Sequence, residues 1–253
     1  MKKAIILISC WFMALGVSYS QSYNTYPELN KFKSWGITGE IGFYPKAELT
    51  PVCGTLDHFR TFPTKGYKVG IEYDFYPANK WSCIVGFLVK FDPMIAFSAD
   101  IASMDYFTIS DTIMGGFCFN APILLSYKQR VYKNIYLDFR AGFHFYLLEP
   151  IEGFGFGGTE LSIGMERNKM NVLGGSFVMS IGGMFDLKYI LLKAHVSYSL
   201  ANMDGIHNGE YDFVDDIDPA NNAGGYIKQS GNYLGLSLSF NLKKFKYKLD
   251  KQL

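Results

Sequence analysis

Eight segments of the chain alternate apolar and polar residues with a period of two, which is the pattern of a β-strand with one apolar face. They are 34–44, 66–76, 81–91, 115–127, 134–147, 174–185, 190–200 and 231–242. In the fifth, the apolar Leu137 and Phe139 alternate with Asp138. Each segment has about 10 to 14 residues, whereas strands of soluble proteins average roughly 5 to 6. A tilted membrane strand needs about 9–11 residues, so the lengths favour membrane-spanning strands.

The connections between these segments alternate in length along the chain. The long ones are 45–65, 92–112, 148–171 and 201–229, and the short ones are 77–80, 128–133 and 186–189. Outer-membrane barrels join their strands by short periplasmic turns and longer external loops. A soluble exported sandwich, which is the alternative, has no reason to sort its loops by end. The sequence therefore predicts an all-β fold, an antiparallel eight-stranded up-and-down transmembrane β-barrel with both termini in the periplasm.

Residues 1–20 have the pattern of a secretory signal peptide. Lys2 and Lys3 precede an uncharged run that ends at Val17, and Ser18 and Ser20 place small residues before a cleavage point after Ser20. A membrane-anchoring helix is the alternative, although the run is shorter than the ~20 residues that a spanning helix needs. We expect a signal peptide at 1–20, a periplasmic N-terminal segment at 21–33, the barrel at 34–242 and a basic periplasmic tail at 243–253.

Charge is scarce in the chain and unevenly distributed. Charged residues make up 19% and aromatic residues 17%, and the net charge is +1, which excludes a disordered chain and a nucleic-acid-binding domain. The four long connections hold sixteen acidic and six basic residues, whereas the three short ones and the tail hold ten basic and two acidic. Solvated loops are the plain explanation of this asymmetry. Tyrosine and tryptophan gather at strand ends, as in the aromatic girdles of membrane barrels, at Trp35, Tyr44, Tyr67, Tyr76, Trp81, Tyr127, Tyr132, Tyr189 and Tyr233.

The polar face of the alternating segments carries ionisable residues of both signs. An eight-stranded barrel has a lumen that side chains just fill, and buried charges need partners because an unpaired one is strongly destabilising. We therefore expect a salt-bridged polar core that plugs the lumen. A gated ion path, in a narrow channel, is the alternative. The expected network consists of Glu40, Lys68, Glu72, Asp74, Lys90, Asp138, Arg140, His144, Lys193 and His195.

Together, the signal peptide, the eight alternating segments and the sorted connections resemble the small outer-membrane β-barrel proteins of Gram-negative bacteria, in the OmpA-like barrel superfamily. The Tyr- and Gly-rich segments and the Lys-rich end are most similar to the barrels of Bacteroidota, which include general surface proteins and the PorT-type barrel linked to type IX secretion. The resemblance covers roughly 34–242. It implies a surface-binding, structural or secretion-accessory role and includes no catalytic motif.

One short motif favours an enzyme instead. His195-Val196-Ser197 resembles the His-x-Ser of outer-membrane lipid A 3-O-deacylases, which also use a Glu further along, and Glu210 follows at a plausible distance. A carboxylate that orients a histidine allows it to activate a serine hydroxyl. Tyr198 departs from the Asn usual in that family, and the alternation points His195 and Ser197 into the lumen, away from lipid. A lipid A-modifying enzyme is thus the runner-up to a non-enzymatic role.

The last long connection contains an acidic cluster, at Asp212, Asp215, Asp216 and Asp218. Carboxylate oxygens suit hard divalent cations, but the spacing does not match a calcium loop, so these are weak metal candidates. No cofactor motif is found, and Cys53, Cys83 and Cys118 form no disulfide framework. The expected partners are outer-membrane lipid and lipopolysaccharide, together with a periplasmic or secretion-system protein that the basic tail would meet.

Overall fold

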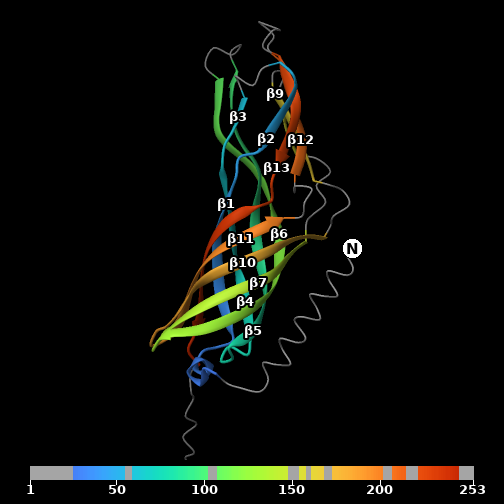
Figure 1. Cartoon of the computed structure of the whole chain (residues 1–253). Coiled ribbons are helices and arrows are strands. Elements are labelled where there is room, and N and C mark those ends of the chain that lie inside the picture. Colours follow the sequence, from blue (N-terminus) through green and yellow to red (C-terminus); the bar gives the residue numbers. More distant parts are fainter. Residues whose placement is uncertain are drawn as a thin grey trace, which may run out of the picture.

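The computed structural model describes residues 25–54, 59–101, 107–147, 154–157, 161–167, 173–201, 207–214 and 222–244. The predicted signal peptide and all of the tail beyond Lys244 lie outside these residues. The largest element is a closed barrel (Figure 1). Its strands are β1 (Trp35–Tyr44), β4 (Thr64–Phe75), β5 (Trp81–Ile101), β6 (Phe107–Tyr132), β7 (Ile135–Leu147), β10 (Leu173–Asp186), β11 (Ile190–Ala201) and β14 (Tyr233–Leu242).

Every neighbouring pair in this ring is antiparallel, and the ring follows chain order. The barrel closes where β1 pairs with β14, with Ile37 opposite Phe240. Each of the eight alternating segments of the sequence corresponds to one of these eight strands, with boundaries that differ by at most two residues where the segment extends past the strand. The predicted all-β, antiparallel, eight-stranded up-and-down fold is therefore confirmed.

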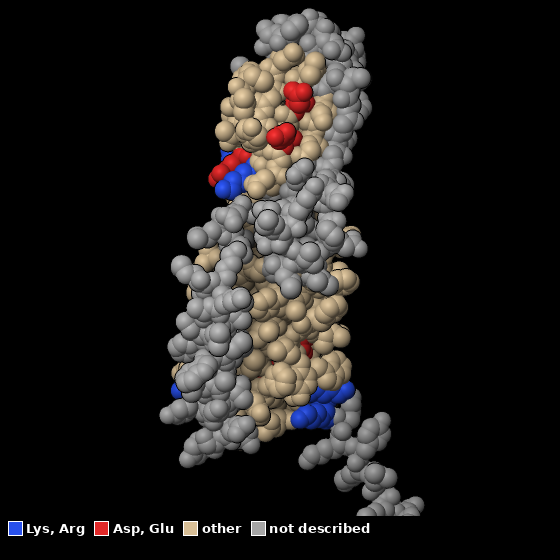
Figure 2. Space-filling view, turned by 90° about the vertical axis from the view of Figure 1, so that its right-hand side faces the viewer, with Lys and Arg blue, Asp and Glu red and all other residues tan. Residues whose placement is uncertain are grey.

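The outer wall of the barrel is apolar and its interior is polar, which is the reverse of a soluble protein. On β4, the outward Val69 and Ile71 are 59% and 54% exposed, whereas Lys68, on the inward face, is 6% exposed. Figure 2 shows the wall as a broad, almost entirely uncharged band between charged ends. A continuous apolar surface of this extent is unfavourable in water and suits the hydrocarbon of a bilayer. The fold is thus that of a transmembrane barrel.

Helices contribute little to the described part of the chain. No helix within the described ranges combines the length and the apolar character needed to cross a membrane.

Strands β5 and β6 continue well beyond the barrel wall. The sequence predicts a loop at 92–112, but the two strands pair as far as Ile101 opposite Phe107. The ladder shifts register between Pro93 and Ile95 and again between Phe97 and Ala99. Such irregularities bend and twist a strand pair, so one predicted external loop is largely an extended hairpin.

The other long connections form a second sheet above the barrel. Its order is β2–β13–β12–β9–β8, and all its pairs are antiparallel. The strands are β2 (Glu48–Cys53), β8 (Phe154–Gly157), β9 (Leu161–Arg167), β12 (His207–Phe213) and β13 (Ala223–Gln229). A short strand, β3 (Phe59–Thr61), pairs with the outer part of β5. We call these six strands and the outer parts of β5 and β6 the head.

The head has its own apolar core. Residues from three of the long connections and from β5 pack together there, and a stacked ring pair, Phe59 against Tyr211, has centroids 5.2 Å apart. The core comprises Ala47, Phe59, Ile95, Phe97, Leu161, Ile163, Tyr211, Phe213, Ala223 and Ile227, with Leu49 packed against it. Burial of these side chains explains why the connections fold as strands.

The opposite end, where short turns join the barrel strands, is closed by the N-terminal segment. We call residues 25–33 the plug, which includes the 3-10 helix η1 (Pro27–Lys31). Leu29 and Phe32 of the plug are almost fully buried against lumen residues such as Tyr136 and Met184. Lys31 Nζ also donates to Asp186 Oδ2 at 2.7 Å. The segment predicted only as periplasmic is therefore a stopper in the lower mouth.

Candidate functional site

The ten ionisable residues of the predicted network all lie on inward-facing strand positions. Eight of them are buried, and Glu40 and Glu72 are partly buried, with side chains 11% and 14% exposed. They come from strands β1, β4, β5, β7 and β11, because alternate residues of each strand point inward. Two connected groups result, a lower one near the plug and an upper one near the head.

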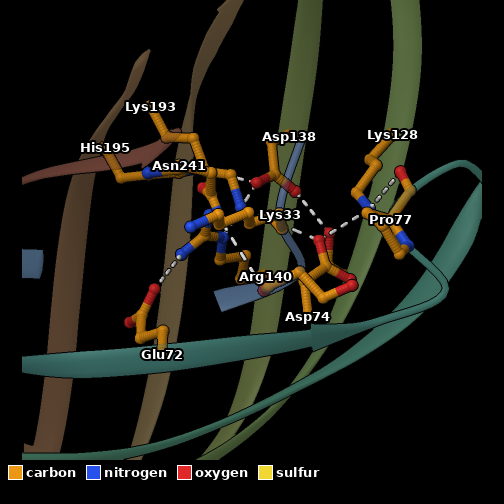
Figure 3. A network of polar contacts seen from close by, with 12 residues as sticks. Lys33, Glu72, Asp74, Pro77, Lys128, Asp138, Arg140, Lys193, His195 and Asn241 are labelled. Carbon is orange, nitrogen blue, oxygen red and sulfur yellow. Dashed lines mark hydrogen bonds and ion pairs between the residues drawn. The ribbon is translucent and has the colours of Figure 1, made fainter. Parts of the chain in front are cut away.

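Asp138 is the centre of the lower group (Figure 3). Its Oδ2 accepts from Arg140 Nε at 2.8 Å and lies 3.0 Å from His195 Nε2. Its Oδ1 accepts from the Ser126 hydroxyl at 2.6 Å. Arg140 Nη1 also reaches Glu72 Oε2 at 3.4 Å. Four strands are therefore tied together around one fully buried carboxylate.

A second carboxylate of the lower group, Asp74, holds two lysines. Its Oδ2 accepts from Lys128 Nζ at 2.9 Å and lies 3.7 Å from Lys193 Nζ. Sequence reasoning missed Lys128, because 128–133 reads as a turn. In the structure β6 continues to Tyr132, so Lys128 faces inward and is fully buried. The period of two, extended by one more inward position from Ser126, would have found it.

The upper group is built around Lys68. Its Nζ forms an ion pair with Glu40 Oε1 at 2.7 Å, donates to the Tyr233 hydroxyl, and lies 3.4 Å from His144 Nδ1. Asn120 Nδ2 lies 3.3 Å from the same ring nitrogen. Charge and hydrogen bonding together lock the side chains of β1, β4, β6, β7 and β14.

Three aromatic rings lie around Lys90 in the lumen. Its Nζ lies 4.4 Å from the ring centroid of Tyr146, 5.6 Å from that of Tyr44 and 5.8 Å from that of Tyr233. A cation over aromatic faces is stabilised by the ring quadrupoles. The prediction that Tyr44 and Tyr233 belong to an outer aromatic girdle is wrong, since both are buried inward. Position near a strand end does not decide which face a tyrosine takes.

With Lys128 added and the two histidines left aside, the predicted network places four carboxylates and five cationic side chains in the lumen. Buried charges of opposite sign in contact hold the barrel in one arrangement, because separating any pair would leave an unpaired charge in a poorly hydrated space. With the plug below, these paired side chains fill the described part of the lumen.

The proposed deacylase residues are not brought together. His195 contacts Asp138, and the Ser197 hydroxyl donates to a different carboxylate, Glu40 Oε2, at 3.5 Å. Glu210 lies in β12 of the head, opposite Gly164 and Tyr226 and exposed. Because sequence distance does not report which sheet a strand joins, the spacing of Glu210 from His195 was misleading.

Only one residue of the predicted acidic cluster lies among the described residues. Asp212 lies on β12 with an exposed side chain, and Asp215, Asp216 and Asp218 lie outside the described residues. Within the described ranges, no group of three or more His, Cys, Asp or Glu side chains is placed to hold a metal ion.

The outer face of the head sheet carries a hollow of about 450 Å³. Along β12, Glu210 and Asp212 project from this face, with Gly164 opposite Glu210 and Gly224 opposite Asp212. A Cβ at Gly164 would meet nothing within 4 Å, and one at Gly224 would meet Asp212 Oδ1 at 3.3 Å. The absence of side chains at these glycines leaves the space open. It is lined by Val52, Cys53, Ser162, Gly164, Glu210, Tyr211, Asp212, Gly224, Gly225 and Tyr226.

Comparison with known proteins finds no matching family model and no matching curated protein. Three solved structures are similar in shape. The outer membrane protein OprG from Pseudomonas aeruginosa is 10% identical with a TM-score of 0.43, and the match covers 84% of this chain and 98% of OprG. The outer membrane protease OmpT from Escherichia coli is 7% identical with a TM-score of 0.37, covering 83% and 94%. The β domain of the Bordetella autotransporter BrkA is 8% identical with a TM-score of 0.29, covering 83% and 98%.

The closed ladder of eight antiparallel strands, rather than these distant similarities, defines the class of protein, a transmembrane β-barrel. The resemblance to Bacteroidota and PorT-type barrels stays a prediction.

Proposed function

We propose that this chain is an outer-membrane protein in which a filled barrel anchors a folded external head, and that the head binds a ligand at the cell surface. The observation that carries the proposal is the head itself. Its long connections fold into a cored β-structure with a hollow on the outer face, whereas the lumen is occupied by paired side chains. A binding surface needs such a rigid, exposed platform.

The apolar wall supports the membrane placement. Side chains such as Phe87 and Leu238 are 58% and 60% exposed in the middle of the strands, and aromatic residues including Trp35, Trp81 and Tyr189 lie toward the turn end. Outer-membrane barrels place short turns in the periplasm and long loops outside. In this orientation the head is external, and the plug and both termini are periplasmic.

The chemistry of the hollow suits a hydroxyl-rich ligand, such as a glycan. Tyr226, 56% exposed, offers an aromatic face next to two carboxylates, Glu210 and Asp212. Sugars present apolar C–H faces that pack on aromatic rings and hydroxyls that donate to carboxylates. Gly164 and Gly224 leave room for a ring at this level of the sheet.

Cys53 provides a direct test of the orientation. It is exposed in the head, whereas Cys83 and Cys118 lie in the barrel strands. A membrane-impermeant thiol reagent applied to intact cells should label the wild-type protein and leave a Cys53→Ser variant unlabelled. Labelling that requires permeabilised cells would place the head in the periplasm and contradict the proposal.

Ligand binding is tested with purified protein in detergent on an array of bacterial and host polysaccharides. A Glu210→Gln, Tyr226→Ala variant should bind about tenfold or more weakly, since central aromatic and charged contacts dominate binding energy. Arg60→Gln, which changes an exposed residue of β3 on another sheet, is the matched control and should bind normally. Equal retention of glycans by both variants would exclude the hollow as the site.

A further inference from the structure

Lysines surround the lower end of the barrel on its outer side. Each of the three short turns there carries one, and so does the chain on both sides of the β1–β14 pair. We call this set the lysine rim, and its members are Lys33, Lys80, Lys133, Lys188, Lys243 and Lys244, all partly or fully exposed. Figure 2 shows Lys and Arg side chains at this end of the visible face, below the uncharged band. The ring order of the strands spreads these positions around the circumference.

The lysine rim keeps its positive charge. Among the described residues, none of its six members forms an ion pair with a carboxylate. The nearby acids are already paired with other cations. Asp186, at the end of β10, pairs with Lys31 at 2.7 Å, and Glu28 of the plug pairs with Arg130. A cationic ring without internal counter-charges attracts anions from its surroundings.

Aromatic side chains hold three of these ammonium groups close to the barrel wall. Lys33 Nζ lies 4.8 Å from the Trp35 ring, Lys80 Nζ 5.1 Å from the Tyr127 ring and Lys188 Nζ 5.0 Å from the Tyr189 ring. The Tyr127 ring packs in turn on Trp81, at 4.7 Å between centroids. Tryptophan and tyrosine at the end of a membrane strand lie at the headgroup level of the bilayer. The stacked ammonium groups are thereby fixed at the depth of lipid phosphates.

The head end of the barrel wall has fewer lysine–aromatic pairs than the turn end. Only one lysine–aromatic pair of this kind is found there among the described residues, Lys65 over Phe43 at 6.0 Å. The long connections above that end are net acidic by sequence. An anionic headgroup is therefore favoured at one end of the barrel only.

We propose that the lysine rim binds the phosphate groups of anionic phospholipid in the leaflet that meets the turn end of the barrel. The proposal rests on the membrane placement given under the proposed function. It assigns a second binding surface to the protein, at the opposite end from the hollow in the head.

The tryptophans make a selective probe of this surface. The chain has three, and apart from Trp11 they are Trp35 and Trp81, both at the lysine rim. The full chain with Trp11→Phe is reconstituted in phosphatidylcholine vesicles that contain either phosphatidylglycerol or phosphatidylcholine with brominated acyl chains, at equal mole fraction. Brominated phosphatidylglycerol should quench the fluorescence more, with a relative binding constant about fivefold higher, as expected for roughly one lysine–lipid contact.

Variants assign the preference to particular lysines. A Lys33→Gln, Lys80→Gln variant should bring the binding ratio to about one, because these two ammonium groups adjoin the reporting tryptophans. Lys65→Gln, at the other end of the wall, is the matched control and should leave the ratio unchanged. Equal quenching by both brominated lipids in the parent protein, or a ratio that survives the double substitution, would overturn the proposal. Absence of quenching by either lipid would contradict the membrane placement itself.

Discussion

The barrel and the head are built from the same alternation of apolar and polar residues, but they use it in opposite senses. In the barrel, Asp138 and Lys68 point inward and Leu236 and Ile71 point outward. In the head, Ile163 and Phe213 point inward and Glu210 and Asp212 point outward. A period of two sorts residues between two faces, and the surrounding medium decides which face is exposed. Lipid around the barrel and water around the head account for the reversal.

The two interiors also differ in how they resist substitution. The barrel depends on a few strong contacts between charges, and the head depends on many weak apolar contacts. One consequence is that the loss of a single charge should damage the barrel more than the loss of one side chain damages the head.

The largest effect is expected from Arg140→Ala. It leaves Asp138 and Glu72 without their guanidinium partner and should lower the free energy of unfolding by about 3–5 kcal/mol. Heat-dependent gel mobility and urea unfolding in detergent measure the loss. Planar-bilayer recording should find no large conductance in either form, because the other lumen side chains and the plug stay in place.

Arg130→Ala is the control for that measurement. Arg130 pairs with Glu28 at the partly exposed lower mouth, with side chains 42% and 31% exposed, so the expected loss is roughly 1 kcal/mol or less. A wide, stable conductance in the wild type would show that the lumen is open and would remove the contrast between anchor and head.

A cavity in the head core should destabilise the head and leave the stability of the barrel unchanged. Ile163→Ala removes a fully buried side chain of β9 and should cost about 2–5 kcal/mol of head stability. Limited proteolysis should cleave the head sooner, while the heat-dependent mobility of the barrel stays unchanged. Val52→Ala, at a site 68% exposed, is the comparison and should have little effect. Simultaneous collapse of both regions would mean that they fold as one unit.

The stability of the head should fall at alkaline pH, because Tyr211 ionises there. Burial, with a contribution from nearby Cys53, raises the pKa of Tyr211 above its usual value near 10. The neutral phenol is favoured in the folded head, so head stability is constant below about pH 10 and falls as the pH rises toward the higher folded pKa. Circular dichroism in urea, under conditions in which the barrel stays folded, follows this decline. Tyr211→Phe should abolish it.

The same substitution should not destabilise the head at neutral pH. Within the part of the chain that the structure describes, the buried Tyr211 hydroxyl has no hydrogen-bond partner. Removal of an unsatisfied buried hydroxyl is neutral or stabilising, by up to roughly 1 kcal/mol. A clear loss of stability in Tyr211→Phe would reveal a partner for this group.

The smallest effect is expected from Ser197→Ala. Its hydroxyl makes one long contact, 3.5 Å to Glu40, and is not joined to His195 and Glu210 in a triad. The lipid A mass spectrum of a strain with this variant should match that of the wild type. A shift by the mass of one acyl chain would restore the deacylase interpretation and move function from the head into the barrel.

The sequence by itself determined the barrel. Eight long alternating segments and the sorted connections sufficed, because the period of two depends only on neighbouring residues of one strand. The same local rule points the ten lumen candidates inward and indicates that charges such as Arg140 and Asp138 share an interior.

Only the tertiary structure decided what depends on contacts between distant segments. It joined the long connections into the head, inserted the plug into the lower mouth, turned Tyr44 and Tyr233 inward around Lys90, and separated Glu210 from His195. Apart from the inward direction of the two tyrosines, which the period of two already gives, none of these has a local signature in the sequence. Which strands become neighbours, and which medium surrounds each face, depends on the burial and pairing of side chains far apart in the chain.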